Sequence, residues 1–294
     1  MTSSRNYSMD SDDYLFDERA AARALDRAAR MFNEYAVIER DIADRLFERL
    51  NLMKINPTTI LDCGARAGYT TSALHNHFPN AEVIGLELGS NILKQAKKRK
   101  NITLITSSLI EFPFLQDSFD LIFSNVTLHK SPQLEMTLYA WHRLLKPDGL
   151  LLFSTLGPDT LQELRQSFKE EKHVHPFMDM HHLGDLLQQN FLGPVMETEY
   201  VTVYYVSVMQ LLREIKSTGA QNILTNRLRG LLGKDKWHAM LNRYEAFKNS
   251  NTHFPATLEI VYGHAWKGKL KNRDSLNQES ESIFPVSALK LKKE

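Results

Sequence analysis

Residues 60–69 read ILDCGARAGY. An apolar run typical of a buried strand leads into a turn with two glycines, Gly64 and Gly68, and then into a helical pattern. Glycine lets a backbone approach a ligand closely, and the start of a helix offers unpaired N–H groups and a positive dipole end. The stretch therefore predicts a ligand-binding strand–turn–helix unit. Taken alone, it fits a plain tight turn equally well.

Strand patterns and helical patterns alternate outward from this stretch. Strands are expected at residues 59–62, 82–87, 102–105, 119–124, 149–155 and 198–203, and helices at 70–78, 91–100, 133–145, 159–168 and 180–190. Short alternating units predict a Rossmann-like, doubly wound α/β fold, whose mainly parallel sheet is covered by helices on both faces.

The alternation stops near residue 205. Helical patterns at 207–217, 222–232 and 235–247 precede a strand at 256–264, which predicts an inserted helical cap at about 206–250 and a last, antiparallel edge strand. Residues 17–50 predict two helices with a break near Asn33 and Glu34. We expect residues 17–266 to form the folded domain, between a disordered tail at 1–16 and a mostly flexible segment at 267–294.

The composition is that of an ordinary globular chain, with 43% hydrophobic and 24% charged residues among 294. Thirty-six basic residues against 35 acidic ones give a net charge of +1, so no overall field favours nucleic acid or a membrane. The single cysteine, Cys63, excludes an internal disulfide and fits a reducing compartment. Without a signal or transit pattern at the start, we expect a cytoplasmic protein.

An acidic residue, Glu87, ends the second expected strand. A carboxylate about twenty residues after such a turn accepts hydrogen bonds from both hydroxyls of a bound ribose. A solvated glutamate at a strand end is the alternative, and the spacing favours the ribose interpretation.

Two further segments follow in the same order, EFPFLQDSFDLIFSN at 111–125 and LLKPDG at 144–149. Together with the turn and Glu87, they resemble class I S-adenosylmethionine-dependent methyltransferases over about half of the chain. The resemblance implies S-adenosylmethionine as the cofactor. The cofactor-binding residues that it implies are Phe32, Asp62, Gly64, Arg66, Gly68, Glu87, Leu88, Ser108, Leu109 and Asn125.

Four other motifs give a closer resemblance: LDRAARMFNEYAV at 25–37, FSTLGPDTL at 153–161, HPFMDMH at 175–181 and VYGHAW at 261–266. They resemble the malonyl-acyl-carrier-protein O-methyltransferases of biotin synthesis. This resemblance implies methyl transfer to the free carboxylate of malonyl-acyl carrier protein. A mitochondrial hydroxylase that assists complex I assembly shares much of the same pattern.

The sequence departs from these families at four positions. Arg66 replaces the middle glycine of the turn, Ser108 a common aspartate, Lys130 a common aromatic residue and Phe32 a common tyrosine. The loss of two cofactor contacts, at about 1–3 kcal/mol each, would weaken binding severely. Two functions therefore remain open: an active carboxyl methyltransferase, and a degenerate methyltransferase fold that serves as a binding or assembly factor. Action on a different acceptor is a third possibility.

A malonyl carboxylate is already ionised at neutral pH, so its methylation needs no general base, and no catalytic residue is assigned. Polar side chains expected to orient the acceptor are His129, His175, His181, Tyr262 and His264, each of which alternatively has only a structural role. The scattered histidines predict no metal site.

An acyl carrier protein is strongly acidic and needs a basic landing face. Candidates in the cap are Arg213, Lys216, Arg227, Arg229, Lys234 and Lys236, for which a solvated surface is the alternative.

Overall fold

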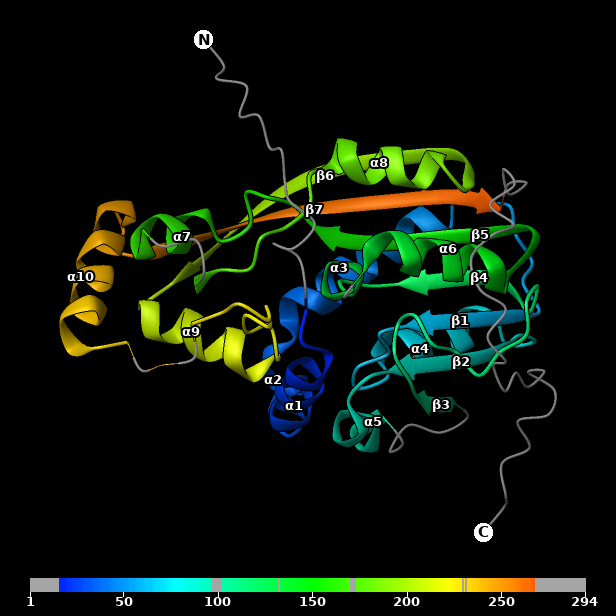
Figure 1. The fold of residues 1–294 in the computed structure, drawn as a ribbon, viewed down its shortest axis with the longest axis horizontal. Coiled ribbons are helices and arrows are strands. Elements are labelled where there is room, and N and C mark those ends of the chain that lie inside the picture. Colours follow the sequence, from blue (N-terminus) through cyan, green and yellow to red (C-terminus); the bar gives the residue numbers. More distant parts are fainter. Residues whose placement is uncertain are drawn as a thin grey trace.

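The computed structural model describes residues 16–96, 102–131, 133–169, 173–228, 230 and 232–267. One sheet of seven strands has the order β3-β2-β1-β4-β5-β7-β6 (Figure 1). The strands are β1 (Thr59–Cys63), β2 (Glu82–Glu87), β3 (Thr103–Thr106), β4 (Phe119–Ser124), β5 (Leu145–Leu156), β6 (Phe191–Tyr205) and β7 (Phe254–Lys267). Each expected strand is present, and the predicted fold class is confirmed.

Strands β1 to β5 are parallel and carry helices on both faces. The helices are α4 (Tyr69–His77), α5 (Ser90–Ala96), α6 (Leu134–Leu144) and α8 (Met180–Gln188). Successive residues of a strand point to opposite faces. Leu61 accordingly packs in a cluster with α6 and α8, whereas Ile60 packs with α4 and the N-terminal helix α3 (Val37–Leu50).

The last strand of the sequence does not take the edge of the sheet. Strand β7 lies between β5 and β6 and pairs antiparallel with both, so β6 is the edge strand. The prediction of an antiparallel edge is confirmed, but its assignment to residues 256–264 is wrong. Strand β6 pairs with β7 from Phe191 to Tyr205, which leaves no free edge on β7.

The far ends of β6 and β7 carry the helical cap. A separate apolar cluster joins Tyr205 and Phe254 of these strands to α9 (Val208–Ser217), α10 (Lys234–Tyr244) and α7 (Gln162–Phe168). Helix α7 precedes the predicted insertion. The predicted helix at 222–232 is absent among the described residues of that segment, because the Asn222 side chain accepts a hydrogen bond from Leu224 N and holds a turn.

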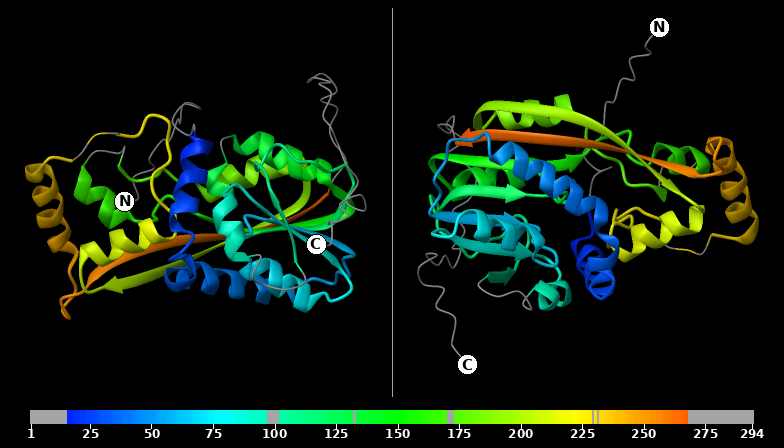
Figure 2. Two further views of the ribbon diagram at one scale, coloured as in Figure 1. Left: turned by 90° about the horizontal axis from the view of Figure 1, so that it is seen from below. Right: turned by 180° about the vertical axis from the view of Figure 1, so that it is seen from behind.

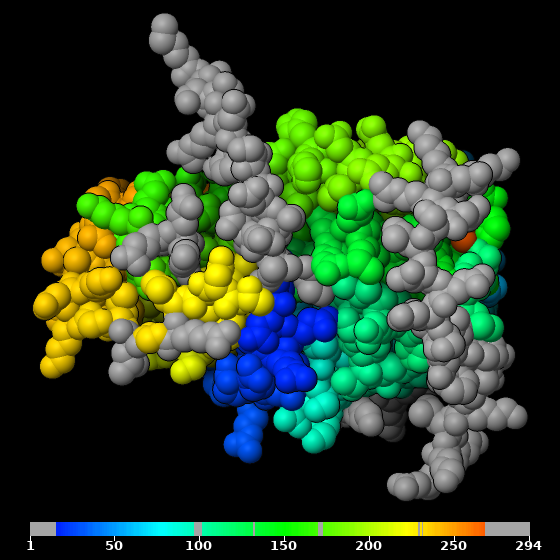
Figure 3. Space-filling view, viewed as in Figure 1, coloured from blue at the N-terminus to red at the C-terminus, as the bar shows by residue number. Residues whose placement is uncertain are grey.

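Three N-terminal helices, α1 (Glu18–Ala28), α2 (Phe32–Tyr35) and α3, precede the sheet. The expected break near Asn33 and Glu34 is misplaced, since both residues belong to α2. Helix α1 contacts α5 of the core and α9 of the cap, and it stands between these two parts (Figures 2 and 3). The expected tails lie outside the described residues, except for their ends at Phe16 and Lys267. In the described ranges, no helix is long and apolar enough to cross a membrane.

Candidate active site

The turn between β1 and α4 requires both of its predicted glycines. Gly64 has φ +91°, and a Cβ added there would lie 2.0 Å from Thr127 Oγ1. Gly68 has φ +76° and forms the N-cap of α4. A side chain at either position would be strained. The turn therefore brings backbone close to the segment that follows β4.

Asp62, at the end of β1, is fully buried below this turn. Its Oδ2 accepts hydrogen bonds from the hydroxyls of Thr70 and Thr71, each at 2.6 Å. Its Oδ1 is buried without a hydrogen-bond partner. Burial raises the pKa of Asp62 to about 6. An unpartnered buried oxygen beside the turn is an acceptor that a ligand cation or N–H group can use.

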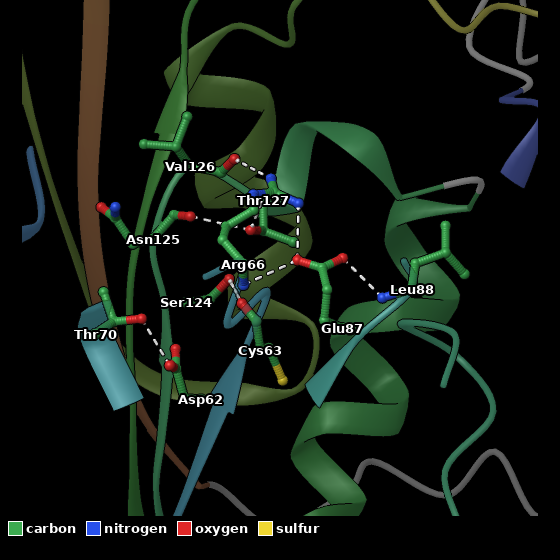
Figure 4. A network of polar contacts seen from close by, with 10 residues as sticks. All are labelled: Asp62, Cys63, Arg66, Thr70, Glu87, Leu88, Ser124, Asn125, Val126 and Thr127. Atoms are coloured by element: carbon green, nitrogen blue, oxygen red, sulfur yellow. Dashed lines mark hydrogen bonds and ion pairs between the residues drawn. The ribbon is translucent and has the colours of Figure 1, made fainter. Parts of the chain in front are cut away.

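Glu87 ends β2 on the other side of the turn, with a side chain that is only 2% exposed. Its Oε1 accepts a hydrogen bond from Leu88 N at 2.7 Å. Its Oε2 accepts hydrogen bonds from Arg66 N at 3.0 Å and from Arg66 Nη1 at 3.1 Å (Figure 4). The predicted ribose acceptor is thus in place and is held by an arginine.

Arg66 adopts a left-handed backbone, with φ +49°. This conformation costs a non-glycine residue about 1–2 kcal/mol. The ion pair with Glu87 offsets this cost, and Arg66 Nη2 also donates to Val126 O at 3.2 Å (Figure 4). The side chain therefore lies across the space between β2 and the segment after β4.

A small cavity lies beside Glu87. Its volume is about 20 Å³, whereas one buried water needs about 10–15 Å³. Helix α1 closes one wall through Glu18, Ala21 and Leu25. Ser108 donates a hydrogen bond to Glu18 Oε1 at 2.6 Å, which fixes this wall. The cavity has no room for an adenosyl group while Arg66 holds Glu87.

Of the other predicted cofactor residues, two line the small cavity and two lie elsewhere around the turn. Leu88 and Leu109 line the small cavity. Phe32 packs in the apolar cluster that contains Ala67 of the turn. Asn125 is fixed by hydrogen bonds to Glu39 O at 2.8 Å and from the Ser154 hydroxyl at 2.7 Å.

A larger cavity of about 110 Å³ lies between the core and the cap. Its walls come from α3, the segment after β4, strands β6 and β7, and α9, and they are mainly apolar. The large and small cavities share two lining residues, Arg66 and Lys130. Two basic side chains therefore lie between the two cavities.

Two of the five predicted acceptor residues, His129 and His175, line the large cavity. His175 Nε2 lies 3.1 Å from His129 O. Burial lowers the pKa of His175 to about 3 and that of His129 well below its usual range, so both are neutral.

The other three predicted acceptor residues lie elsewhere. His181 is exposed and pairs with Asp179. Tyr262 packs against α3, where Arg49 lies 3.7 Å above its ring. His264, half-buried on β7, is not part of the cavity wall.

Sequence reasoning missed three charged residues in the wall of the large cavity. Glu39 lies on α3, Lys130 on the 3-10 helix η2 (Leu128–Lys130), and Glu214 on α9. Glu214 accepts a hydrogen bond from the Tyr205 hydroxyl at 3.0 Å, and burial raises its pKa. The departure at Lys130 was visible in the sequence. Nothing there indicated that the side chain is enclosed.

The predicted docking residues divide into three groups. Arg213, Lys216, Lys234 and Lys236 are exposed on α9 and α10. Arg227 is bound to Asp17 by an ion pair of 3.2 Å, and Arg229 lies outside the described residues. Within the described ranges, no group of His, Cys, Asp and Glu is arranged to hold a metal ion.

Comparison with known proteins assigns the family. A family model described as a methyltransferase domain matches residues 56–244. The chain is 44% identical to malonyl-acyl-carrier-protein O-methyltransferase 1 of Coxiella burnetii over 272 residues, which are 92% of this chain and 95% of that one. The chain belongs to the malonyl-acyl-carrier-protein O-methyltransferase family.

A second member of this O-methyltransferase family, from Gallionella capsiferriformans, is 37% identical over 90% of this chain and 96% of its own. Among solved structures, the YcgJ protein from Bacillus subtilis superposes with a TM-score of 0.56 at 16% identity, over 76% of this chain and 98% of that one. The structural likeness shows the shared fold, and the sequence likeness shows the family.

Proposed function

We propose that the protein is an S-adenosylmethionine-dependent methyltransferase that esterifies the free carboxylate of malonyl-acyl carrier protein in biotin synthesis. Family membership supports the reaction class. One structural observation supports it further. Arg66 and Lys130 line both the small cavity at the predicted cofactor turn and the large apolar cavity, so the two cavities lie side by side. A methyl donor and an acceptor in these two cavities would face each other.

The residues around the turn have the hydrogen-bonding groups that S-adenosylmethionine needs. The unpartnered Oδ1 of Asp62 provides a buried acceptor on one side of the turn, and the Glu87 carboxylate provides one for ribose hydroxyls on the other. When bound, S-adenosylmethionine supplies an electrophilic methyl group on a sulfonium. Binding requires Arg66 to release Glu87, since the present space holds little more than a water.

The protein's own contribution to the reaction is placement and desolvation. The acceptor carboxylate is ionised without help, so no side chain has to remove a proton. The apolar wall of the large cavity excludes water from it. Neutral His129 and His175 can donate hydrogen bonds that help to orient the anion. Catalysis then rests on holding the attacking oxygen about 3 Å from the methyl carbon and in line with the bond that breaks.

The carrier protein is proposed to dock on the outer face of α9. Arg213 and Lys216 are exposed there, while Leu211 and Glu214 of the same helix line the large cavity. A partner bound to this face lies directly outside the acceptor site. Opposite charges on the two surfaces would guide the encounter.

One observation favours a second function. Arg66 already neutralises the residue that should bind ribose, and the cavity beside Glu87 is nearly filled. A protein that kept this arrangement permanently would be a methyltransferase fold acting as a binding or assembly factor without cofactor.

Incubation of the purified protein with malonyl-acyl carrier protein and methyl-labelled S-adenosylmethionine separates the two functions. The methyltransferase proposal expects a labelled methyl ester, and it expects none with acetyl-acyl carrier protein, which lacks the free carboxylate. Folded protein that forms no ester under saturating conditions would favour the assembly-factor function.

A further inference from the structure

Lys130 is a part-buried cation in the wall of both cavities. Its side chain comes from η2, directly after the segment that follows β4, and lies between the small and the large cavity. Its Nζ makes no hydrogen bond or ion pair with any described residue. A lysine that gives up part of its hydration to a mainly apolar wall, without a hydrogen-bond partner, is destabilising by itself. Its position calls for an anion that arrives from outside the protein chain.

The neighbouring charges compensate Lys130 only in part, since Arg66 repels it while Glu87 and Glu39 attract it without an ion pair. Arg66 is itself paired with Glu87. Glu39 faces the same cavity from α3, and burial raises its pKa. His129 and His175, which approach from η2 and the loop before α8, are neutral. Burial and the charge of Arg66 lower the pKa of Lys130 to about 7.

We propose that Lys130 is the anchor for the free carboxylate of the acceptor acyl group, at the end of the large cavity nearest the cofactor turn. This inference rests on the proposed function and names the residue that selects an ω-carboxyacyl group over a neutral acyl group. The ammonium of Lys130 donates hydrogen bonds to one carboxylate oxygen and leaves the other facing the small cavity.

The shape of the large cavity favours a carboxyacyl chain over a free inorganic anion. From Lys130 toward the cap its wall is formed by apolar side chains such as Ile42, Leu211 and Leu258. A phosphate would leave these side chains without contact and would lose its hydration. An acyl chain with a carboxylate at one end matches both the charge and the apolar wall.

Binding of small thioesters without cofactor tests the anchor. The probes are malonyl-N-acetylcysteamine, which carries the carboxylate, and acetyl-N-acetylcysteamine, which does not. We expect the wild type to bind the malonyl probe about tenfold to a hundredfold more tightly, as for a charge-assisted hydrogen bond in a dry site. Lys130→Met should remove this preference and leave acetyl binding unchanged. Lys130→Arg should keep most of it, and Lys54→Met, at an exposed lysine, should have no effect.

The pH dependence of the same binding gives a second readout. A protonated Lys130 is needed to hold the carboxylate, so the affinity of the wild type for the malonyl probe should fall as pH rises above about 7. Lys130→Arg should show no such fall, because arginine stays protonated. A fall in affinity above pH 7 that is the same in Lys130→Arg would contradict the anchor.

The outcomes separate the anchor from the proposed function. The wild type could prefer the malonyl probe, lose this preference in Lys130→Met, and still form no methyl ester. That result would support the anchor and contradict the transferase function. Ester formation by Lys130→Met with an unchanged KM for the malonyl substrate overturns the anchor while the function stands. An equal loss of affinity for both probes in Lys130→Met, with an unchanged melting temperature, also overturns the anchor. Selection of the carboxylate would then not depend on Lys130.

Discussion

Arg66 is the residue on which the state of the cofactor site depends. Its backbone is left-handed at φ +49°, and its side chain pairs with the buried Glu87 carboxylate. The same carboxylate is the proposed ribose acceptor. Arg66 and a bound nucleoside therefore compete for one group, and the affinity for the cofactor is reduced by the free energy needed to release it.

Replacement of this arginine should strengthen cofactor binding and lower the stability of the protein without cofactor. Arg66→Gly relieves about 1–2 kcal/mol of backbone strain but removes the cationic partner of the buried Glu87, at about 3–5 kcal/mol, while the backbone hydrogen bonds to Glu87 remain. We expect a loss of about 2 kcal/mol in the free energy of unfolding and a gain of about tenfold in S-adenosylmethionine affinity, measured by denaturation and calorimetry. Arg66→Ala is the matched control. It should gain similar affinity but be less stable than the glycine variant. Unchanged affinity in both variants would refute the competition.

Single residues show which parts of the site the sequence could predict. Gly64 and Glu87 were predictable, because a turn glycine and a strand-end carboxylate at a set spacing have few other uses. The pairing of Arg66 with Glu87 was not, because it depends on where a flexible side chain lies. His181 and Tyr262 belong to motifs of the family, yet they lie outside the large cavity. Membership of a motif does not determine the direction of a side chain.

Helix α1 closes the small cavity, and Asp17 holds its first turn. Asp17 Oδ1 accepts a hydrogen bond from Ala20 N at 2.9 Å, and Oδ2 pairs with Arg227 at 3.2 Å. The backbone N–H of Ala20 and the charge of Arg227 lower the pKa of Asp17. This helix thereby links the wall of the cofactor site to the segment between α9 and α10.

Loss of this cap should destabilise the protein in a pH-dependent way. Asp17→Ala should lower the free energy of unfolding by about 1 kcal/mol at neutral pH. Because the pKa of Asp17 in the folded protein lies below its ordinary value of 3.8, this stabilisation is present above that pH and is lost as pH falls through the folded pKa. Urea denaturation at neutral and strongly acidic pH measures the change. Asp17→Asn, which can still accept from Ala20 N, should lose less; an equal loss would show that the charge matters more than the cap.

At the scale of elements, the sequence predicted the strands well and the segment after α9 poorly. Strand patterns bounded by turns located all seven strands. The parallel strands β1 to β5 were found because such a sheet buries both faces of its strands. Apolar residues at 223, 224, 228, 231 and 232 imitate a helical face. In the structure, Ile223 O accepts from Asp17 N, and Leu224 pairs with Phe16. Long-range pairing replaced the helix that local spacing predicted.

The molecule as a whole has almost no net charge, so recognition of an acidic partner must be local. The sequence contains 36 basic and 35 acidic residues. Helix α9 carries Arg213 and Lys216 on its outer face, next to the wall of the large cavity. The cap formed by α7, α9 and α10 on the extended ends of β6 and β7 thus combines the acceptor cavity with a basic surface (Figure 1).

Charge reversal on this helix should weaken carrier-protein binding selectively. Arg213→Glu combined with Lys216→Glu should raise the Kd for malonyl-acyl carrier protein about tenfold or more at low salt. The difference from the wild type should shrink as ionic strength rises, because exposed charges are screened. Affinity for the small malonyl thioester should stay the same. The exposed Lys54→Glu, near the start of β1, serves as the control. Unchanged carrier affinity at low salt would exclude α9 as the docking face.

Calorimetric titration of the purified protein with S-adenosylmethionine shows whether the turn at 64–68 and Glu87 together bind a sulfonium nucleoside. We expect one site per chain with micromolar affinity. Glu87→Gln, which keeps the size of the side chain but not its charge, should lower this affinity at least tenfold. Folded wild-type protein that gives no binding heat and no rise in melting temperature at millimolar S-adenosylmethionine would contradict the expected binding.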